Sequence, residues 1–490
     1  MDEVVPGPGE LSPREVERGL RFGIVDGVFA NAMFTLCSGA ILAALALFAG
    51  MSDFDYGVLA ALPFLAQGLQ LPAGLLYRKF QNRKAVTIAF ATAGRLSIFL
   101  VAAAVLFFPP GLQTAGIFAG LFAWSAFTAV AGGSWLWWMR DLVPEERLGR
   151  YFGTRGALLV GLSGPVLFGA GLLIDHQRAV GGAEGERAAF AAIYVVAALF
   201  GIGSSVFLSL MPHPRPRDDP SVVPIRESLA APFKDPNFRR LLQWLVLWGF
   251  GATMTLPFFP IFLLVDHGLP ISTVTALLVV GTATNVVFFV LWGRLSDRHG
   301  NKPVLAVAVP VFAAGLLATP FVPDGGALEI AAVVLIQVLF SIGTAGADLA
   351  SWNLAFKMAR GPATPAYLSG TLLVRALATG TGPLMGGIIG AAAVASSADL
   401  GVLRVAHLEF VFLAGAVLVL ASARPLASVR EIGEAPRGEL LRALHAEAAT
   451  GSLYPGVRHF ALASSYLVRA VVRGEELAKA SLPRSRRNSK

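Results

Sequence analysis

Four ionisable side chains stand within long apolar stretches of the 490-residue chain: Asp26, Arg95, Asp348 and Arg375. An ionisable residue at the centre of a membrane-spanning helix costs roughly 2.5–3.5 kcal/mol, so each of these needs a partner or a function. Asp348 precedes Lys357 by nine residues, and Arg375 lies a similar distance into the next apolar stretch. Since a helix rises about 1.5 Å per residue, the two lie at comparable depths. We expect a salt bridge, which is either purely structural or lets Asp348 take up a proton when Arg375 moves or a solute binds.

Asp26 follows Arg21 by only a few residues, which predicts a position nearer the membrane surface. It is either a second proton-coupling residue or the interfacial partner of a basic loop residue. Arg95 has no clear partner in the sequence, and we expect it to pack against the preceding span near Gln67 and Gln70.

A polar face runs along the stretch that contains Asp348. Gln337, Ser341, Thr344, Asp348 and Trp352 follow one another at spacings of four, three, four and four residues, which places them on one side of a helix. A polar stripe on a membrane helix faces protein or water rather than lipid. We therefore expect this face to line a cavity.

Composition excludes several classes of protein. Only 14% of the residues are charged and the mean hydropathy is +0.66, whereas about a quarter of a soluble domain is charged. The seven histidines are scattered, Cys37 is the only cysteine, and no phosphate-binding glycine loop is present. We therefore expect no enzyme activity, no cofactor and no metal site. The net charge of +8 is not gathered on one domain, so we expect no nucleic-acid partner either.

Twelve apolar runs are long enough to cross a membrane as helices, which need about 20 residues each. They cover roughly 22–50, 57–76, 85–108, 112–139, 152–174, 188–211, 241–265, 272–292, 303–322, 328–356, 366–393 and 405–423. If the N-terminus is cytoplasmic, the cytoplasmic loops carry nineteen Lys and Arg and the outer loops three. This asymmetry predicts that both termini are cytoplasmic.

The runs divide into two sets of six. The Pro- and charge-rich segment 212–240 separates them, and Gly-Pro at 164–165 recurs at 382–383, a shift of 218 residues. "YRKFQNRKAV" recurs as "SDRHGNKPV" at nearly the same shift, which favours a duplicated six-helix unit. The predicted organisation is an N-terminal segment 1–20, a bundle 21–211, a cytoplasmic linker 212–240, a second bundle 241–423 and a tail 424–490.

The second copy of this repeat resembles a signature loop. "GRLSDRHGNKP" matches the pattern G-x-L-x-D-R-x-G-R/K-K of the major facilitator superfamily, with gating residues Gly293, Asp297, Arg298, Gly300 and Lys302. The resemblance implies an all-α membrane protein of twelve transmembrane helices in two pseudo-symmetric bundles, with a central cavity and alternating access. It also implies that Asp297 meets the start of the fifth span, near Arg150 to Gly153, when the cytoplasmic side is closed. The first copy has Arg78 in place of the Asp, so this inner gate is expected to be asymmetric.

The resemblance places spans one, four, seven and ten around the cavity. The predicted substrate-cavity residues are Asn31, Trp124, Thr128, Trp244, Trp248, Gln337, Thr344, Asp348, Trp352 and Arg375, and the proton-coupling candidates are Asp348 and Asp26. We expect a monomeric, proton-coupled exporter of a small organic solute in the inner (plasma) membrane of a bacterium. The Trp-rich cavity favours an amphipathic or moderately apolar solute; uptake of an anionic metabolite at Arg375 is the alternative within this class.

Two other functions fit the same sequence: a non-transporting sensor or assembly partner, and a lipid or lysolipid flippase. The tail contains twelve Lys and Arg and six Glu. Its segments "RGELLRALHAEA" and "YLVRAVVRGEELAKA" are predicted to form amphipathic helices, which suit contact with anionic lipid headgroups. A solvated tail is the alternative.

Overall fold

The chain was analysed as a computed structural model, which describes residues 11–70, 82–214, 232–359, 364–394, 396–399, 404–436, 438–440 and 442–443. The first half contains α1 (Pro13–Leu36), α2 (Gly39–Phe48), α3 (Asp53–Ala66), η1 (Gln67–Leu69), α5 (Arg83–Phe107), α6 (Pro110–Leu142), η2 (Glu145–Arg147) and α7 (Leu148–Leu210). The second half contains α9 (Pro236–Thr255), η3 (Leu256–Phe258), α10 (Phe259–Ile261), η4 (Phe262–Asp266), α11 (Ile271–His299), α12 (Asn301–Ala318), η5 (Thr319–Phe321), α13 (Gly326–Met358) and α14 (Thr364–Ala393). The antiparallel strands β1 (Ser397–Asp399) and β2 (Arg404–Ala406) precede α15 (Glu409–Ala421) and α16 (Ala423–Ser428).

Ten helical stretches of the described residues are long and apolar enough to cross a membrane. The 63-residue α7 counts once but makes two crossings, because it reverses direction at Gly182, whose φ of 58° and ψ of −140° are not helical. A Cβ on Gly185 would lie 2.1 Å from the carbonyl oxygen of Gln177, so the two passes of α7 meet closely at this turn. With α3, the arrangement is consistent with the twelve predicted spans.

Three helix ends differ from the predicted boundaries. α1 begins at Pro13 behind a capping box of Ser12 and Glu15, so it extends into the predicted N-terminal segment. α9 begins at Pro236, inside the predicted linker, because the Asp235 side chain accepts hydrogen bonds from the first free amides of the helix. The first span is broken between Leu36 and Gly39, where Gly39 has a φ of 57°.

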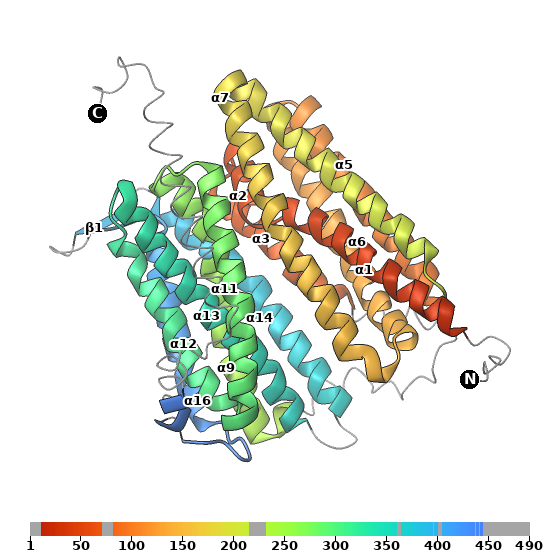
Figure 1. The fold of residues 1–490 in the computed structure, drawn as a ribbon. Coiled ribbons are helices and arrows are strands. Elements are labelled where there is room, and N and C mark those ends of the chain that lie inside the picture. Colours follow the sequence, from red (N-terminus) through yellow and green to blue (C-terminus); the bar gives the residue numbers. More distant parts are fainter. Residues whose placement is uncertain are drawn as a thin grey trace.

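The two halves lie side by side, the first coloured red to yellow and the second green to blue (Figure 1). We name the two ends of the bundle by their loops. The hairpin end holds β1, β2 and the turn of α7 at Gly182, and the motif end holds Gly300 between α11 and α12.

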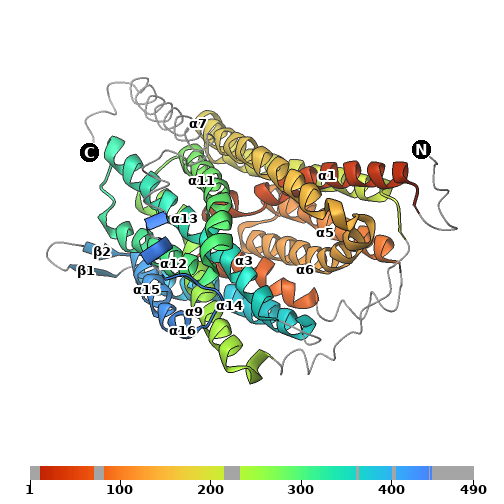
Figure 2. The ribbon, with the colours of Figure 1, turned by 60° about the horizontal axis from the view of Figure 1, so that its bottom comes forward.

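The halves contact each other through two helix pairs, α3 with α14 and α7 with α11, which both views place side by side (Figures 1 and 2). A Cβ on Gly57 would lie 2.5 Å from the carbonyl oxygen of Pro383, and a Cβ on Gly171 would lie 2.5 Å from Thr275 Oγ1. Only glycine allows such close helix contact. These contacts lie towards the hairpin end, where Tyr56 also donates a hydrogen bond of 2.7 Å to the carbonyl of Pro257.

The halves are apart at the motif end. A Cβ built on Gly149, Gly153 or Gly156, at the start of α7, would have no neighbouring atom within 4 Å. Asp297, near the end of α11, is exposed and has no hydrogen bond or ion pair among the described residues. The structure is therefore closed at the hairpin end and open at the motif end.

Candidate functional site

A pocket of about 330 Å³ lies between the two halves. Phe64 and Gln67 line it from the first half, and the remaining lining residues come from α9, η3, α13 and α14. Five of the predicted cavity residues line it: Trp248, Thr344, Asp348, Trp352 and Arg375. This is a cavity at the interface of the halves, as the resemblance implied.

An ion pair dominates this central pocket. Arg375 on α14 donates to Asp348 on α13 in a close salt bridge, so the pairing expected from depth is present in the structure. The Asp348 side chain is 48% exposed although it sits in the middle of an apolar helix, so its carboxylate faces the open space of the pocket. The Arg375 guanidinium lies 5.4 Å from the centre of the Trp352 ring, a cation–π arrangement that fixes its plane.

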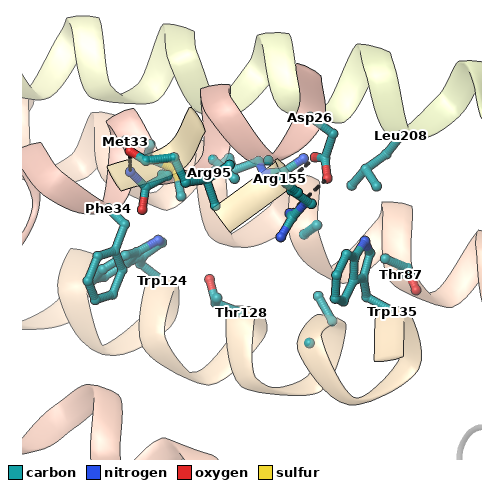
Figure 3. Close-up of a pocket in the computed structure, with 17 residues that line it drawn as sticks. Asp26, Met33, Phe34, Thr87, Arg95, Trp124, Thr128, Trp135, Arg155 and Leu208 are labelled. Carbon is teal, nitrogen blue, oxygen red and sulfur yellow. Dashed lines mark hydrogen bonds and ion pairs between the residues drawn. The ribbon is translucent and has the colours of Figure 1, made fainter. Parts of the chain in front are cut away.

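A second pocket of about 280 Å³ lies within the first half, lined by α1, α5, α6 and α7. Three of the predicted cavity residues line it: Asn31, Trp124 and Thr128. Figure 3 shows Arg95 and Arg155 reaching towards Asp26, with Trp124, Thr128 and Trp135 along the facing helix.

Asp26 is the centre of a buried charge cluster in this first-half pocket. It is 3% exposed, accepts a short hydrogen bond from Ser204, and lies 3.7 Å from Arg95 Nη2 and 3.9 Å from Arg155 Nη2. Arg95 donates a further hydrogen bond of 2.6 Å to Ser205. Asp26 is thus buried inside the first half, and Arg95 has the partner that the sequence did not reveal.

Arg155 is the residue that the sequence placed wrongly. It was counted among the basic loop residues, but it lies in the first two turns of α7 with its side chain 17% exposed. Its Nε donates a hydrogen bond of 3.1 Å to the carbonyl of Gly23, and its guanidinium lies 4.8 Å from the centre of the Trp135 ring. Arg155 is one of the nineteen cytoplasmic charges counted from the sequence, although the predicted run 152–174 already contains it, and α7 begins four residues earlier, at Leu148.

The two pockets share one arrangement. In the first half Arg155 of α7 lies over Trp135 of α6, and in the second half Arg375 of α14 lies over Trp352 of α13. The arginines are 220 residues apart in sequence and the tryptophans 217, close to the shift of the Gly-Pro repeat. This correspondence supports the duplication predicted from the sequence.

Two predicted cavity residues line neither of these pockets. Trp244 is fully buried and stacks beneath Trp248, with ring centres 6.1 Å apart. Gln337 packs against Gly281 of α11, where a Cβ would lie 2.1 Å from the Gln337 amide nitrogen. The polar face of α13 therefore divides: its second half lines the cavity and its first half contacts α11.

The signature motif is helical rather than a loop. α11 continues through Gly293, Asp297 and Arg298 to His299, and only Gly300, with a φ of 92°, separates it from α12. The predicted span 272–292 ends where charged residues begin, but these charged residues form the last two turns of the same helix, α11.

Glu431 of the tail completes this motif. Its Oε2 accepts hydrogen bonds of 2.8 Å from the backbone amides of Asn301 and Lys302, and its Oε1 lies 2.8 Å from Lys357 Nζ. Burial alone would raise the pKa of Glu431, but the hydrogen bonds from Lys302, Lys357 and Asn301 outweigh it and hold the pKa below its usual value. Lys302 also pairs with Glu434 at 3.0 Å.

The first part of the tail packs on protein, whereas the predicted contact of its amphipathic segments with lipid stays a prediction. Val429 and Leu440 are fully buried, and the backbone amide of Ala435 donates to the carbonyl of His299. The rest of the predicted amphipathic segments, beyond residue 443, lies outside the described residues.

The predicted latch between Asp297 and the start of α7 is not formed in this conformation, because the halves are apart at the motif end. The equivalent contact is formed at the hairpin end by Asp175, in the first pass of α7. Its Oδ1 accepts a hydrogen bond of 3.2 Å from the amide of Ile271, and its Oδ2 accepts one of 2.7 Å from the amide of Ser272. Asp175 therefore caps the N-terminus of α11 across the interface.

His407 forms a second link at the hairpin end. Its Nε2 lies 2.9 Å from Asp53 of α3, and its Nδ1 lies 2.6 Å from Asp266 of η4. Two carboxylate acceptors require both ring nitrogens to donate, so the ring is an imidazolium. The hydrogen bonds that His407 donates to Asp266 and Asp53 raise its pKa to about 10. Glu409, at the start of α15, and the pair His267–Glu329 are the other titratable groups near this link.

A family model described as "Major Facilitator Superfamily" matches residues 27–383 and 249–471 of the chain. No curated protein matches the sequence. The fold is similar to the crystal structure of the nucleoside transporter NupG, with a TM-score of 0.63 and 14% identity over 85% of this chain and 98% of that one. It is also similar to a bacterial homologue of the human lysosomal transporter Spinster in an inward-facing, occupied conformation (TM-score 0.63, 15% identity, 87% and 97% covered) and to a D-xylose–proton symporter (0.57, 16%, 86% and 98%).

Replacing Asp175 with Asn is expected to open the hairpin end. The carboxylate at the α11 N-terminus contributes about 1–2 kcal/mol to closure, so the closed population should fall roughly 5–30-fold relative to the open one. The measurement is the distance between spin labels on introduced cysteines at Val180 and Leu328, which are exposed on opposite halves. The native Cys37 is fully buried and stays unlabelled. Asn at the neighbouring exposed position His176 is the control; an unchanged distance distribution for Asp175→Asn would exclude the cap as a latch.

The His407 link predicts that hairpin-end closure weakens with rising pH. In the closed state the pKa of His407 is about 10, and opening removes Asp53, which lowers it. The contribution to closure is therefore complete below about pH 6.5 and is lost as the pH rises towards 10. The same label pair should show more of the open state at pH 9.5 than at pH 6.5, and His407→Gln should remove that difference while His176→Gln keeps it. An identical pH response in His407→Gln would assign the effect to other groups.

Glu431→Gln is expected to release residues 429–440 from the motif. Removing the carboxylate charge from this hydrogen-bonded cluster costs about 3–5 kcal/mol, because two helix amides and Lys357 lose the charge to which they donate. Amide hydrogen exchange should become faster in 429–440 and in the first turn of α12. Glu434→Gln removes only the exposed partner of Lys302 and serves as the control. Equal protection in Glu431→Gln and the unmodified protein would show that the tail is held by its apolar contacts alone.

Proposed function

The chain belongs to the Major Facilitator Superfamily, and from this premise we propose that it is a secondary active transporter that moves a small organic solute by alternating access. The observation that carries the proposal is the central pocket. It is lined from both halves, contains a partly exposed ion pair, and lies between an end that is closed and an end that is open. A cavity reached from one side at a time is what transport by rocking requires.

We propose that the motif end is cytoplasmic. The basic residues gather in the segments at that end, as the positive-inside rule predicts. Without Arg155, which lines the first-half pocket, the cytoplasmic segments still contain far more Lys and Arg than the outer loops. The closed hairpin end is then the outer gate, and the chamber loads from the cytoplasm in this conformation. We take the protein to be a monomer in an inner (plasma) membrane and the direction of transport to be export.

We propose that protons drive transport through Asp348. Its carboxylate is paired with Arg375 and is about half exposed in the pocket, so water that enters from the open end can exchange protons with it. Protonation would remove the negative charge that holds Arg375 and free the guanidinium for a solute group. Asp26 has no comparable access to water, because Ser204, Arg95 and Arg155 surround it at 3% exposure. Of the two candidates, the geometry therefore supports Asp348 better.

Asp348→Asn is expected to reduce solute-dependent proton movement at least tenfold, because the amide cannot exchange a proton. The assay is purified protein in liposomes that contain a pH-sensitive dye. The test solutes are uridine, D-xylose, a dipeptide, and small aromatic acids and amines, with protein-free liposomes correcting for passive permeation. Asp324→Asn, at an exposed site outside the spans, is the matched control.

Three outcomes would count against the proposal. Full proton coupling in Asp348→Asn would exclude this carboxylate, and flux driven only by an inward-directed solute gradient would exclude export. No flux with any solute, from protein that remains folded, would favour the non-transporting sensor over a transporter.

A further inference from the structure

The first-half pocket holds more positive than negative charge. Arg95 and Arg155 face the single carboxylate of Asp26, with no other ionisable residue lining the pocket. The cluster therefore carries one excess positive charge when Asp26 is ionised and two when it is protonated. An unneutralised charge inside a membrane protein is costly, so this pocket favours an anion in either state.

The hydrogen-bond donors of the pocket also lack partners. Within the described part of the chain, Arg155 donates a hydrogen bond only through its Nε. The N–H groups of its two terminal nitrogens donate none there. The indole nitrogens of Trp124 and Trp135 are buried without any acceptor, and Trp124 is 3% exposed. A ligand in the pocket does not reach these buried indole nitrogens, so the terminal nitrogens of Arg155 are the donors open to it.

We propose that this first-half pocket binds the carboxylate of a small organic acid, held by the guanidinium of Arg155. The inference rests on the proposed function and names the class of solute. The planar guanidinium matches a carboxylate with two parallel hydrogen bonds, and its stacking on Trp135 fixes the plane in advance. Arg95 is a positioning residue: it shares Asp26 with Arg155, and its Nη1 hydrogen bond to Ser205 fixes it behind the pocket.

The size and lining of the pocket indicate the rest of the solute. Phe34 is 48% exposed and lies 5.8 Å from Trp124 between ring centres, so the wall beside the proposed carboxylate site is aromatic. The pocket volume of about 280 Å³ equals that of about nine water molecules, which suits a compact acid with an apolar or aromatic body. A single excess positive charge matches a monoanion better than a phosphate dianion. The solute is thus more charged than the Trp-rich sequence suggested.

The test compares acids with their neutral amides. Purified protein in detergent is titrated with benzoate, phenylacetate and indole-3-acetate, and with benzamide, phenylacetamide and indole-3-acetamide, while the melting temperature and the tryptophan fluorescence are followed. We expect at least one acid to bind saturably and at least tenfold more tightly than its amide. Inorganic phosphate and sulfate separate carboxylate recognition from attraction of any anion. Because no variant is involved, this comparison does not depend on the folding of a mutant.

Variants then locate the site. Arg155→Gln should weaken binding of the acid at least tenfold, and Arg155→Lys should weaken it less. The matched control is Arg140→Gln, because Arg140 also stacks on a tryptophan of α6, Trp137 at 5.3 Å, but lies outside the pocket. It should leave binding unchanged.

Absence of binding by every acid, equal binding of acids and amides, or full affinity in Arg155→Gln would overturn the inference. Phosphate or sulfate binding as tightly as the acids would replace it with a general anion site. Liposome flux distinguishes this failure from that of the proposed function. Flux of a neutral or cationic solute without binding of any acid would support the transporter and contradict the acid site. An acid that binds at Arg155 but is never transported would support the site and contradict the proposed transport function.

Discussion

The conformation of this protein depends on a carboxylate at the N-terminus of a helix from the other half. Asp175 accepts hydrogen bonds from the amides of Ile271 and Ser272, groups that have no partner inside α11. Asp297 lies in the last turns of α11, and the start of α7 is the corresponding uncapped N-terminus at the motif end. The antiparallel pair α7–α11 thus carries one acid near each end: Asp175 caps the partner's first turn in this structure, and we propose that Asp297 does so when the motif end closes. On that proposal one cap forms only when the other is broken, because rigid halves cannot meet at both ends.

The remaining contacts of the closed end strengthen this alternation. Glycines at 57 and 171 let backbones approach so closely that little water or lipid fits between them. His407 joins Asp53 of one half to Asp266 of the other, and as an imidazolium it neutralises part of the charge of both carboxylates. At the motif end, Glu431 and Lys357 fix α12 and α13 within the second half alone. That half can therefore move as a unit while its partner moves away.

The sequence predicted the features that are encoded locally and missed those that depend on distant contacts. Apolar runs and loop charges identified the spans, and helical spacing with depth predicted the pairing of Asp348 with Arg375. Asp26 joins Ser204 and Arg155 across more than a hundred residues, and no periodicity connects them. Glu431 was missed for the same reason: in the sequence it is one acid in a basic tail, and only the fold brings it to the amides of α12. Arg155 and the motif were misplaced because charged helix ends look like loops.

Duplication explains why the two halves share one arrangement of side chains, although the chemistry of the two sites differs. Each places an arginine on a tryptophan at corresponding positions, but the acids differ. In the second half Asp348 pairs with Arg375 one to one, so that site is neutral and partly exposed. In the first half Asp26 is shared by Arg95 and Arg155, so neither arginine is fully neutralised. A neutral, partly exposed pair is suited to exchanging a proton, whereas a positively charged, buried cluster is suited to holding an anion. If the Asp348 pair and the Asp26 cluster act in one transport cycle, protonation of Asp348 leaves Arg375 without a neutralising charge, as Arg155 already is. A carboxylate between the halves would then meet an arginine stacked on tryptophan from either side.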